Sequence, residues 1–160
     1  MLPLHGVQLS VMNPELESIL TDKDISPTAM RLLVLEYLLK QSSAISLKSL
    51  EDEFQHSERT TLYRTLKTFE EKGLIHHIKD GSGHTKYALC SSNCKEGDHH
   101  DLHVHFYCNN CKETFCLSSY KIPNINLPKN FQLEELDLIA KGMCDKCKLI
   151  NAIELHALSK

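Results

Sequence analysis

The chain has 160 residues, enough for one ordinary domain or two small ones, and its 41% hydrophobic and 24% charged residues suit a soluble globular protein. No apolar run reaches the length of a transmembrane helix, and the first dozen residues lack the basic start and cleavage-like site of a signal peptide. The net charge of −3 argues against a protein that coats nucleic acid without sequence preference, although it permits one basic face.

The first part of the chain is predicted to be helical. Residues 14–20 form a short first helix. Ser26 and Pro27 predict the start of a longer helix, because a capping hydroxyl is followed by proline at the first helical position. The apolar residues of this second helix fall on one face at helical spacing, namely Met30, Leu33, Val34, Tyr37 and Leu38.

Two further helices are predicted before the first strand. Ser46 should cap a short helix whose apolar face is Leu47, Leu50 and Phe54. Ser57 should cap the next helix, whose buried face is Leu62, Leu66 and Phe69. Gly73 is predicted to end that helix, since glycine commonly follows the last helical turn.

The periodicity then changes to that of strands. Residues 74–78 and 86–89 are predicted strands, and residues 80–83, with the sequence Asp-Gly-Ser-Gly, form the turn between them. Helices followed by a two-stranded hairpin are the layout of a winged helix-turn-helix domain. In that domain the last helix before the hairpin enters the major groove of DNA.

The outward face of that last helix carries groups that suit DNA. An arginine can fork to guanine or phosphate, while hydroxyls and a lysine can hold the phosphate backbone. A solvated helix face, or a winged helix used only for protein contacts, would also fit this charge pattern. We favour DNA contact by Arg59, Thr60, Tyr63, Arg64 and Lys67.

The composition shifts at residues 90–102, which are polar and rich in potential metal ligands. Strands are predicted after them at 103–107, 113–117 and 131–139, and a final helix at 149–158. We therefore predict an α+β protein with a winged-helix DNA-binding domain at 1–89, a hinge at 90–102 and a small α/β metal-binding domain at 103–160.

Seven cysteines in a chain without an export signal indicate a reducing, cytoplasmic compartment. There, paired Cys-x-x-Cys motifs are typical of metal or redox chemistry rather than of disulfides. Four thiolates from two such motifs complete a tetrahedral zinc site with no open position, which is structural rather than catalytic. The predicted ligands of this structural zinc are Cys108, Cys111, Cys144 and Cys147.

A second metal site is predicted between the two domains. His103 and His105 point to the same side of a strand because side chains alternate, while His76 lies in the hairpin and Cys90 ends it. A nitrogen-rich set with one thiolate suits Zn(II), whereas more oxygen ligands would suit Fe(II) or Mn(II). Further candidate ligands are Cys94, His99, His100, Asp101 and Cys116.

Three motifs together resemble the ferric uptake regulator (Fur) family of bacterial metal-responsive repressors. They are the helix start at 26–31, the helix motif Thr-Leu-Tyr-Arg-Thr-Leu at 61–66 and the metal-binding motif at 103–111. The resemblance implies a homodimer whose second domain is a dimerisation domain. It also implies that Tyr63 and Arg64 contact DNA, and that the metal-loaded protein represses transcription at a palindromic operator.

Within that family, the ligand set at His76, Cys90, His103 and His105 is similar to that of the zinc-uptake branch (Zur). The iron and peroxide branches place carboxylates where this chain has Ala88 and Cys116. We therefore expect a zinc-dependent repressor of metal-uptake genes, with an iron-responsive repressor as the alternative.

Two other classes of function are less consistent with the sequence. A zinc hydrolase would need an open coordination position and a general base, and no His-Glu-x-x-His motif is present. A zinc module that does not bind DNA would lack a salt-dependent, sequence-specific DNA complex.

Overall fold

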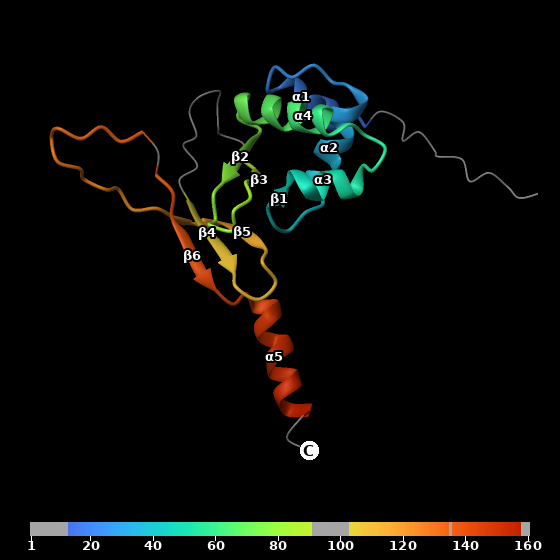
Figure 1. Cartoon of the computed structure of the whole chain (residues 1–160). Coiled ribbons are helices and arrows are strands. Elements are labelled where there is room, and N and C mark those ends of the chain that lie inside the picture. Colours follow the sequence, from blue (N-terminus) through green and yellow to red (C-terminus); the bar gives the residue numbers. More distant parts are fainter. Residues whose placement is uncertain (1–12, 91–102, 135, 158–160) are drawn as a thin grey trace, which may run out of the picture.

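The computed structural model describes residues 13–90, 103–134 and 136–157, and it contains five helices and two small sheets in these ranges (Figure 1). The elements run in the order α1 (Pro14–Thr21), α2 (Ala29–Leu39), β1 (Ile45–Ser46), α3 (Leu47–Glu53), α4 (Arg59–Glu71), β2 (Ile75–Ile78), β3 (Lys86–Leu89), β4 (His103–Cys108), β5 (Thr114–Lys121), β6 (Ile139–Gly142) and α5 (Asp145–Ala157). The predicted α+β class is confirmed. The division into domains at 90–102 stays a prediction, because residues 91–102 lie outside the described residues.

The N-terminal helices pack around one apolar core. The predicted faces of α3 and α4 are confirmed, since Leu50, Leu62, Leu66 and Phe69 are fully buried. The predicted face of α2 was wrong at one position. Leu33 is 43% exposed and Leu35 is fully buried in its place, because this helix is apolar around most of its circumference and its spacing alone does not select the packed face.

Two predicted helix starts were also wrong by one or two residues. The cap of α2 is Thr28 rather than Ser26: Thr28 has an extended backbone and its hydroxyl accepts the Arg31 N–H at 3.5 Å. The residue before α4 is Glu58 rather than Ser57. Ser57 instead donates its backbone N–H to the Phe54 carbonyl at 2.8 Å, in the turn that ends α3. The predicted cap of α3 is correct, since Ser46 and Ser49 form a capping box.

The hairpin of β2 and β3, called the wing below, belongs to an antiparallel sheet with the strand order β1-β3-β2. Gly73, at φ +66°, lets the chain leave α4 and enter β2. His76 pairs with Ala88, and Ile78 pairs with Lys86. The two-residue strand β1 was not predicted, because it is too short to show a period.

The second sheet has the order β5-β4-β6, with β4 antiparallel to β5 and parallel to β6. The predicted strand at 131–139 was wrong over most of its length. Phe131 and Leu133 are exposed in an irregular segment, and pairing with β4 starts only at Ile139. The last helix begins at Asp145, four residues before the predicted Leu149, so that the second Cys-x-x-Cys motif spans its first turn.

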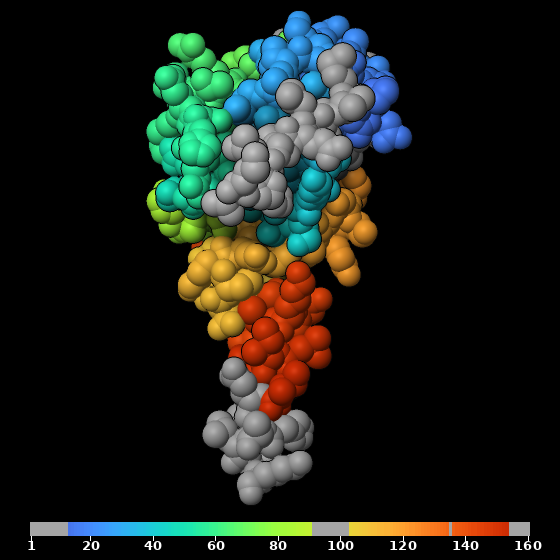
Figure 2. All heavy atoms as spheres, turned by 90° about the vertical axis from the view of Figure 1, so that its right-hand side faces the viewer, coloured from blue at the N-terminus to red at the C-terminus, as the bar shows by residue number. Residues whose placement is uncertain are grey.

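The two sheets lie next to each other, with helices α1 to α4 at one end of the molecule (Figure 1). Helix α5 projects from the opposite end, and the space-filling view shows it as a narrow extension of the body (Figure 2). No helix among the described residues is long and apolar enough to cross a membrane.

Candidate metal centres and DNA-facing helix

The four predicted zinc-binding cysteines come together beside the second sheet, and they are called the cysteine cluster below. Cys108 ends β4, Cys111 lies in the turn after it, and Cys144 and Cys147 flank the start of α5. All four sulfur atoms lie within 4.8 Å of one another, and the Sγ atoms of Cys111 and Cys144 are 3.8 Å apart. Tetrahedral zinc with Zn–S bonds of about 2.3 Å requires sulfur atoms about 3.8 Å apart, so this cluster fits zinc.

The backbone around Cys108 favours the thiolate form of this cysteine. Cys108 is fully buried, and the Cys144 N–H donates to its sulfur at 3.3 Å. Burial raises the pKa of the Cys108 thiol. Hydrogen bonds from the backbone N–H groups of Cys144, Cys111 and Asn110 lower this pKa by more, so that the net shift is downward. Phe106 and Phe115 pack against the cluster and cover its sheet side.

A second group of ligands joins the wing to the second sheet, and it is called the histidine cluster below. It consists of His76 from β2, His103 and His105 from β4, and Cys116 from β5, with ligand atoms all within 4.8 Å. The Nε2 atom of His76 lies 3.1 Å from Nε2 of His105 and 3.6 Å from Sγ of Cys116. Tetrahedral zinc with nitrogen and sulfur ligands requires separations of about 3.3 and 3.6 Å, so these contacts also fit zinc.

Strand geometry explains why these four side chains meet. His103 and His105 alternate onto one side of β4 and are 2% and 6% exposed. Cys116 is the residue of β5 directly opposite His105. Cys116 was only one of several candidates in the sequence, because its position opposite His105 depends on the register of β5.

Cys90, predicted as the thiolate ligand, is not one of these four residues. Its Sγ atom lies 3.5 Å from Nδ1 of His76, on the side of the ring away from His105 and Cys116. The other candidates, Cys94, His99, His100 and Asp101, lie outside the described residues. The neighbouring His77 contacts Glu70 of α4 at 2.6 Å. Burial raises the pKa of the Glu70 carboxyl, but Lys67 and His77 lower it more.

The residues predicted to contact DNA are all exposed on α4, as they would have to be. The apolar side of this helix is buried, which leaves Arg59, Thr60, Tyr63, Arg64 and Lys67 facing outward. Arg59 forms an ion pair with Glu51 of α3, and Lys67 pairs with Glu70 at 3.0 Å. A pocket of about 600 Å³ lies between the start of α4, α3 and the wing, and it is lined by basic and aromatic groups that include Lys48, Arg59 and Tyr63.

A helical domain with a wing, a second sheet with a cysteine cluster and a histidine cluster between them define a two-domain protein of the winged-helix class with two candidate metal sites. The family model of the ferric uptake regulator family matches residues 23–140. This chain therefore belongs to the ferric uptake regulator family, whose members are metal-responsive DNA-binding transcription regulators and not enzymes.

Several solved structures share the fold. A structure titled zinc uptake regulator complexed with zinc and DNA has a TM-score of 0.62 at 21% identity, covering 87% of this chain and 94% of that one. The Vibrio cholerae ferric uptake regulator has a TM-score of 0.53 at 21% identity, covering 80% and 98%. A zinc-bound manganese uptake regulator has a TM-score of 0.55 at 17% identity, covering 81% and 98%. These identities establish the fold alone. Comparison with curated proteins finds no match.

Replacing Cys111 with serine should release one zinc ion per chain and unfold the second sheet together with α5. Cys111 is exposed, so the loss would come from the missing ligand rather than from a cavity. Zinc affinity in such sites, about 10–16 kcal/mol in small zinc domains, is also folding free energy. Zinc counting and circular dichroism measure both effects. The control is Cys116→Ser, which should keep this zinc. A Cys111→Ser protein with full zinc content and native ellipticity would contradict the assignment.

Proposed function

We propose that this protein is a zinc-responsive transcriptional repressor whose sensory site is the histidine cluster. The observation that carries the proposal is the donor set: three imidazoles and one thiolate, His76, His103, His105 and Cys116. Among the described residues this cluster includes no carboxylate. Nitrogen and sulfur donors in tetrahedral arrangement suit Zn(II), while Mn(II) and Fe(II) sites usually include carboxylate oxygen.

The position of the cluster supports a role in regulation. His76 belongs to the wing, whereas the other three ligands belong to the second sheet. A metal ion that binds all four can do so only when the wing lies against that sheet. Metal binding therefore favours the closed arrangement by the difference in its affinity for the closed and open forms. Because α4 and the wing belong to the same packed unit, closure sets the direction in which α4 faces DNA.

Cys90 fits an indirect role in the same site. When Nε2 of His76 binds zinc, Nδ1 carries the ring hydrogen and can donate it to the Cys90 sulfur, 3.5 Å away. Partners of this kind fix the orientation and tautomer of a ligand histidine and raise its basicity.

A homodimer accounts for the exposed apolar side chains of the second half of the chain. A single chain leaves a large group of them open to solvent, which is typical of a surface that a partner covers. They are Tyr120, Ile125, Leu127, Phe131, Leu133, Leu138, Leu149, Ile150 and Ile153. Two copies joined through this surface would present two α4 helices to the two halves of a palindromic operator in cytoplasmic DNA.

The metal preference can be tested by titration. Protein that retains the cysteine-cluster zinc but has an empty sensory site would be titrated anaerobically with Zn(II), Fe(II) and Mn(II) at buffered free concentrations. Fluorescence anisotropy would follow binding to DNA upstream of metal-uptake genes. We expect Zn(II) to restore binding at the lowest free concentration. Restoration by Fe(II) alone would instead make the protein an iron-responsive repressor.

The roles of the two thiols can be separated by substitution. Cys116→Ala should weaken sensory zinc binding by more than about 100-fold, because it removes a ligand. Cys90→Ala should weaken it by about tenfold, the effect of losing an outer hydrogen-bond partner. Competition with a zinc chelator measures both constants. Equal losses in the two variants would show that Cys90 is itself a ligand.

Arg64→Ala should weaken operator binding by about 1–3 kcal/mol while zinc content stays the same, because a guanidinium fork to a base or phosphate is lost. Lys129→Ala removes one exposed positive charge from the second half of the chain and serves as the control. If both variants bound the operator like the wild type, α4 would not be the helix that contacts DNA.

A further inference from the structure

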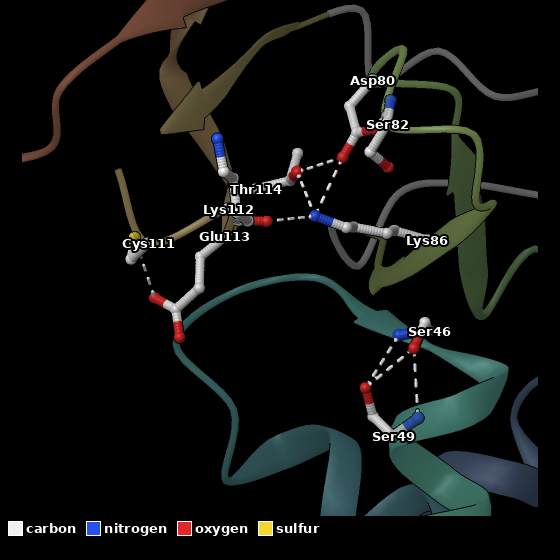
Figure 3. Close-up of polar contacts among 9 residues, drawn as sticks. All are labelled: Ser46, Ser49, Asp80, Ser82, Lys86, Cys111, Lys112, Glu113 and Thr114. Atoms are coloured by element: carbon white, nitrogen blue, oxygen red, sulfur yellow. Dashed lines mark hydrogen bonds and ion pairs between the residues drawn. The ribbon is translucent and has the colours of Figure 1, made fainter. Parts of the chain in front are cut away.

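A second contact between the wing and the second sheet involves no metal ligand. It consists of Asp80 and Lys86 from the wing and Thr114 from the start of β5, and these three residues are called the latch below (Figure 3). The Asp80 and Lys86 side chains are 0% and 12% exposed, and Thr114 is fully buried. A buried ion pair of this kind is stable only where its hydrogen bonds are satisfied.

The ammonium group of Lys86 has three donors, and each finds an acceptor in the latch or beside it. Lys86 Nζ lies 3.0 Å from Asp80 Oδ2, 2.9 Å from Thr114 Oγ1 and 2.6 Å from the carbonyl oxygen of Lys112. Two of these three acceptors belong to the second sheet or to the turn that leads into it. The charge of Lys86 is therefore neutralised by Asp80 within the wing, whereas the other two hydrogen-bond acceptors of its ammonium group come from the other domain.

The carboxylate of Asp80 is bound from both domains as well. It accepts the backbone N–H of Ser82 at 2.8 Å, and it accepts the hydroxyl of Thr114. Burial raises the pKa of this carboxyl, but the hydrogen bonds from Ser82, Thr114 and Lys86 hold it well below the ordinary range, so that it is ionised at neutral pH. The Thr114 hydroxyl thus donates to Asp80 and accepts from Lys86 at the same time.

Thr114 also makes a backbone bond across the contact. Its carbonyl accepts the N–H of Ala44, just before β1, at 2.7 Å. Nearby, the Lys86 and Lys141 ammonium groups lie 5.2 and 5.4 Å from the centre of the Tyr107 ring. Lys141 also approaches Gly81 so closely that a Cβ there would lie 2.8 Å from its Nζ.

The latch and the histidine cluster lie side by side along one pair of strands. Thr114 and Cys116 are two residues apart in β5 and point to the same side. Cys116 contacts His76 near the start of the wing, and Thr114 contacts Lys86 and Asp80 at its turn. The wing is therefore held to β5 at two points, one with metal-ligating groups and one with fixed charges.

We infer that the latch is a metal-independent interdomain contact that sets how much zinc the sensor needs. This inference rests on the proposed function of the protein as a zinc-responsive repressor. The latch stabilises the closed arrangement before metal binds, so that less of the metal's binding free energy is used to bring His76 to the other ligands. A weaker latch should then lower the apparent zinc affinity and leave operator affinity at saturating zinc unchanged.

The main test uses Thr114→Val, which removes the hydroxyl but keeps the shape of the side chain and leaves Asp80 and Lys86 to pair with each other. Lys86→Met is the second variant, and Thr85→Val, an exposed threonine of the same wing, is the control. A hydrogen bond to a charged group corresponds to a factor of about ten or more in a binding constant. We expect Thr114→Val and Lys86→Met to need about ten times more free zinc for half-maximal operator binding.

Hydrogen exchange of the Ala44 amide supplies a readout that does not depend on DNA. This N–H bonds to the Thr114 carbonyl, which both latch variants retain. In full-length protein with the cysteine-cluster zinc bound and the sensory site empty, exchange at Ala44 should be about ten times faster in the two variants than in wild type and Thr85→Val.

The outcomes separate the inference from the proposed function. Faster Ala44 exchange and a raised zinc requirement, with full operator affinity at saturating zinc, would support the latch. Wild-type exchange and zinc requirement in both variants would overturn it. If the wild type bound no operator with any metal, the proposed function would fail. The latch would then be judged by Ala44 exchange together with the zinc affinity measured by chelator competition.

Discussion

The alternation of side chains along β4 is the constraint on which the second half of this molecule depends. This strand is paired on both edges, with β5 and with β6, so its residues cannot rotate without breaking backbone hydrogen bonds. The side chains of His103, His105 and Tyr107 consequently face the wing. On the other side of the strand, Cys108 belongs to the cysteine cluster and Phe106 packs against it. One strand therefore presents two residues of the histidine cluster on one side and one residue of the cysteine cluster on the other.

The cysteine cluster and the histidine cluster differ in how their residues are distributed over the two domains. The cysteine cluster ties the end of β4 to the start of α5, two segments that are distant in sequence, and it lies within a single domain. A metal ion bound by these four cysteines would be part of the fold of that domain. The residues of the histidine cluster come from two domains, so the affinity of a metal ion bound there would contain the free energy of bringing those domains together. Metal binding at a site shared by two domains would favour the arrangement in which the domains lie together, whereas metal binding within one domain has no such direct effect.

The latch also contributes to the free energy of bringing the two domains together, and its contribution does not vary with metal concentration. A buried ion pair, such as Asp80 with Lys86 within the wing, contributes little or nothing unless its polar groups are satisfied, because desolvation opposes it. Here Thr114 and the Lys112 carbonyl supply the missing partners from the second domain. The polar groups of the latch are therefore all satisfied in the docked position that also brings His76 to Cys116.

Residue patterns that repeat locally were predictable. The buried faces of α3 and α4, the turn of the wing and each of the two Cys-x-x-Cys motifs follow from spacing within one segment. The family resemblance added the relation between these segments. Errors arose where local chemistry offered two equivalent choices, as at Ser26 and Thr28 or at Leu33 and Leu35. Both members of each pair have a suitable side chain, so the local sequence alone does not distinguish between them.

Residue identities and the periods of two and 3.6 were enough to predict the winged-helix class, the types of metal ligand and the strand that carries His103 and His105. The folded chain was needed to show which thiol lies beside those histidines and that Asp80, Lys86 and Thr114 are in contact. Cys116 lies opposite His105 through the register of β5, and Thr114 reaches Lys86 through the docking of two domains. Both relations bring together residues far apart in the chain, and no local pattern encodes such a distance.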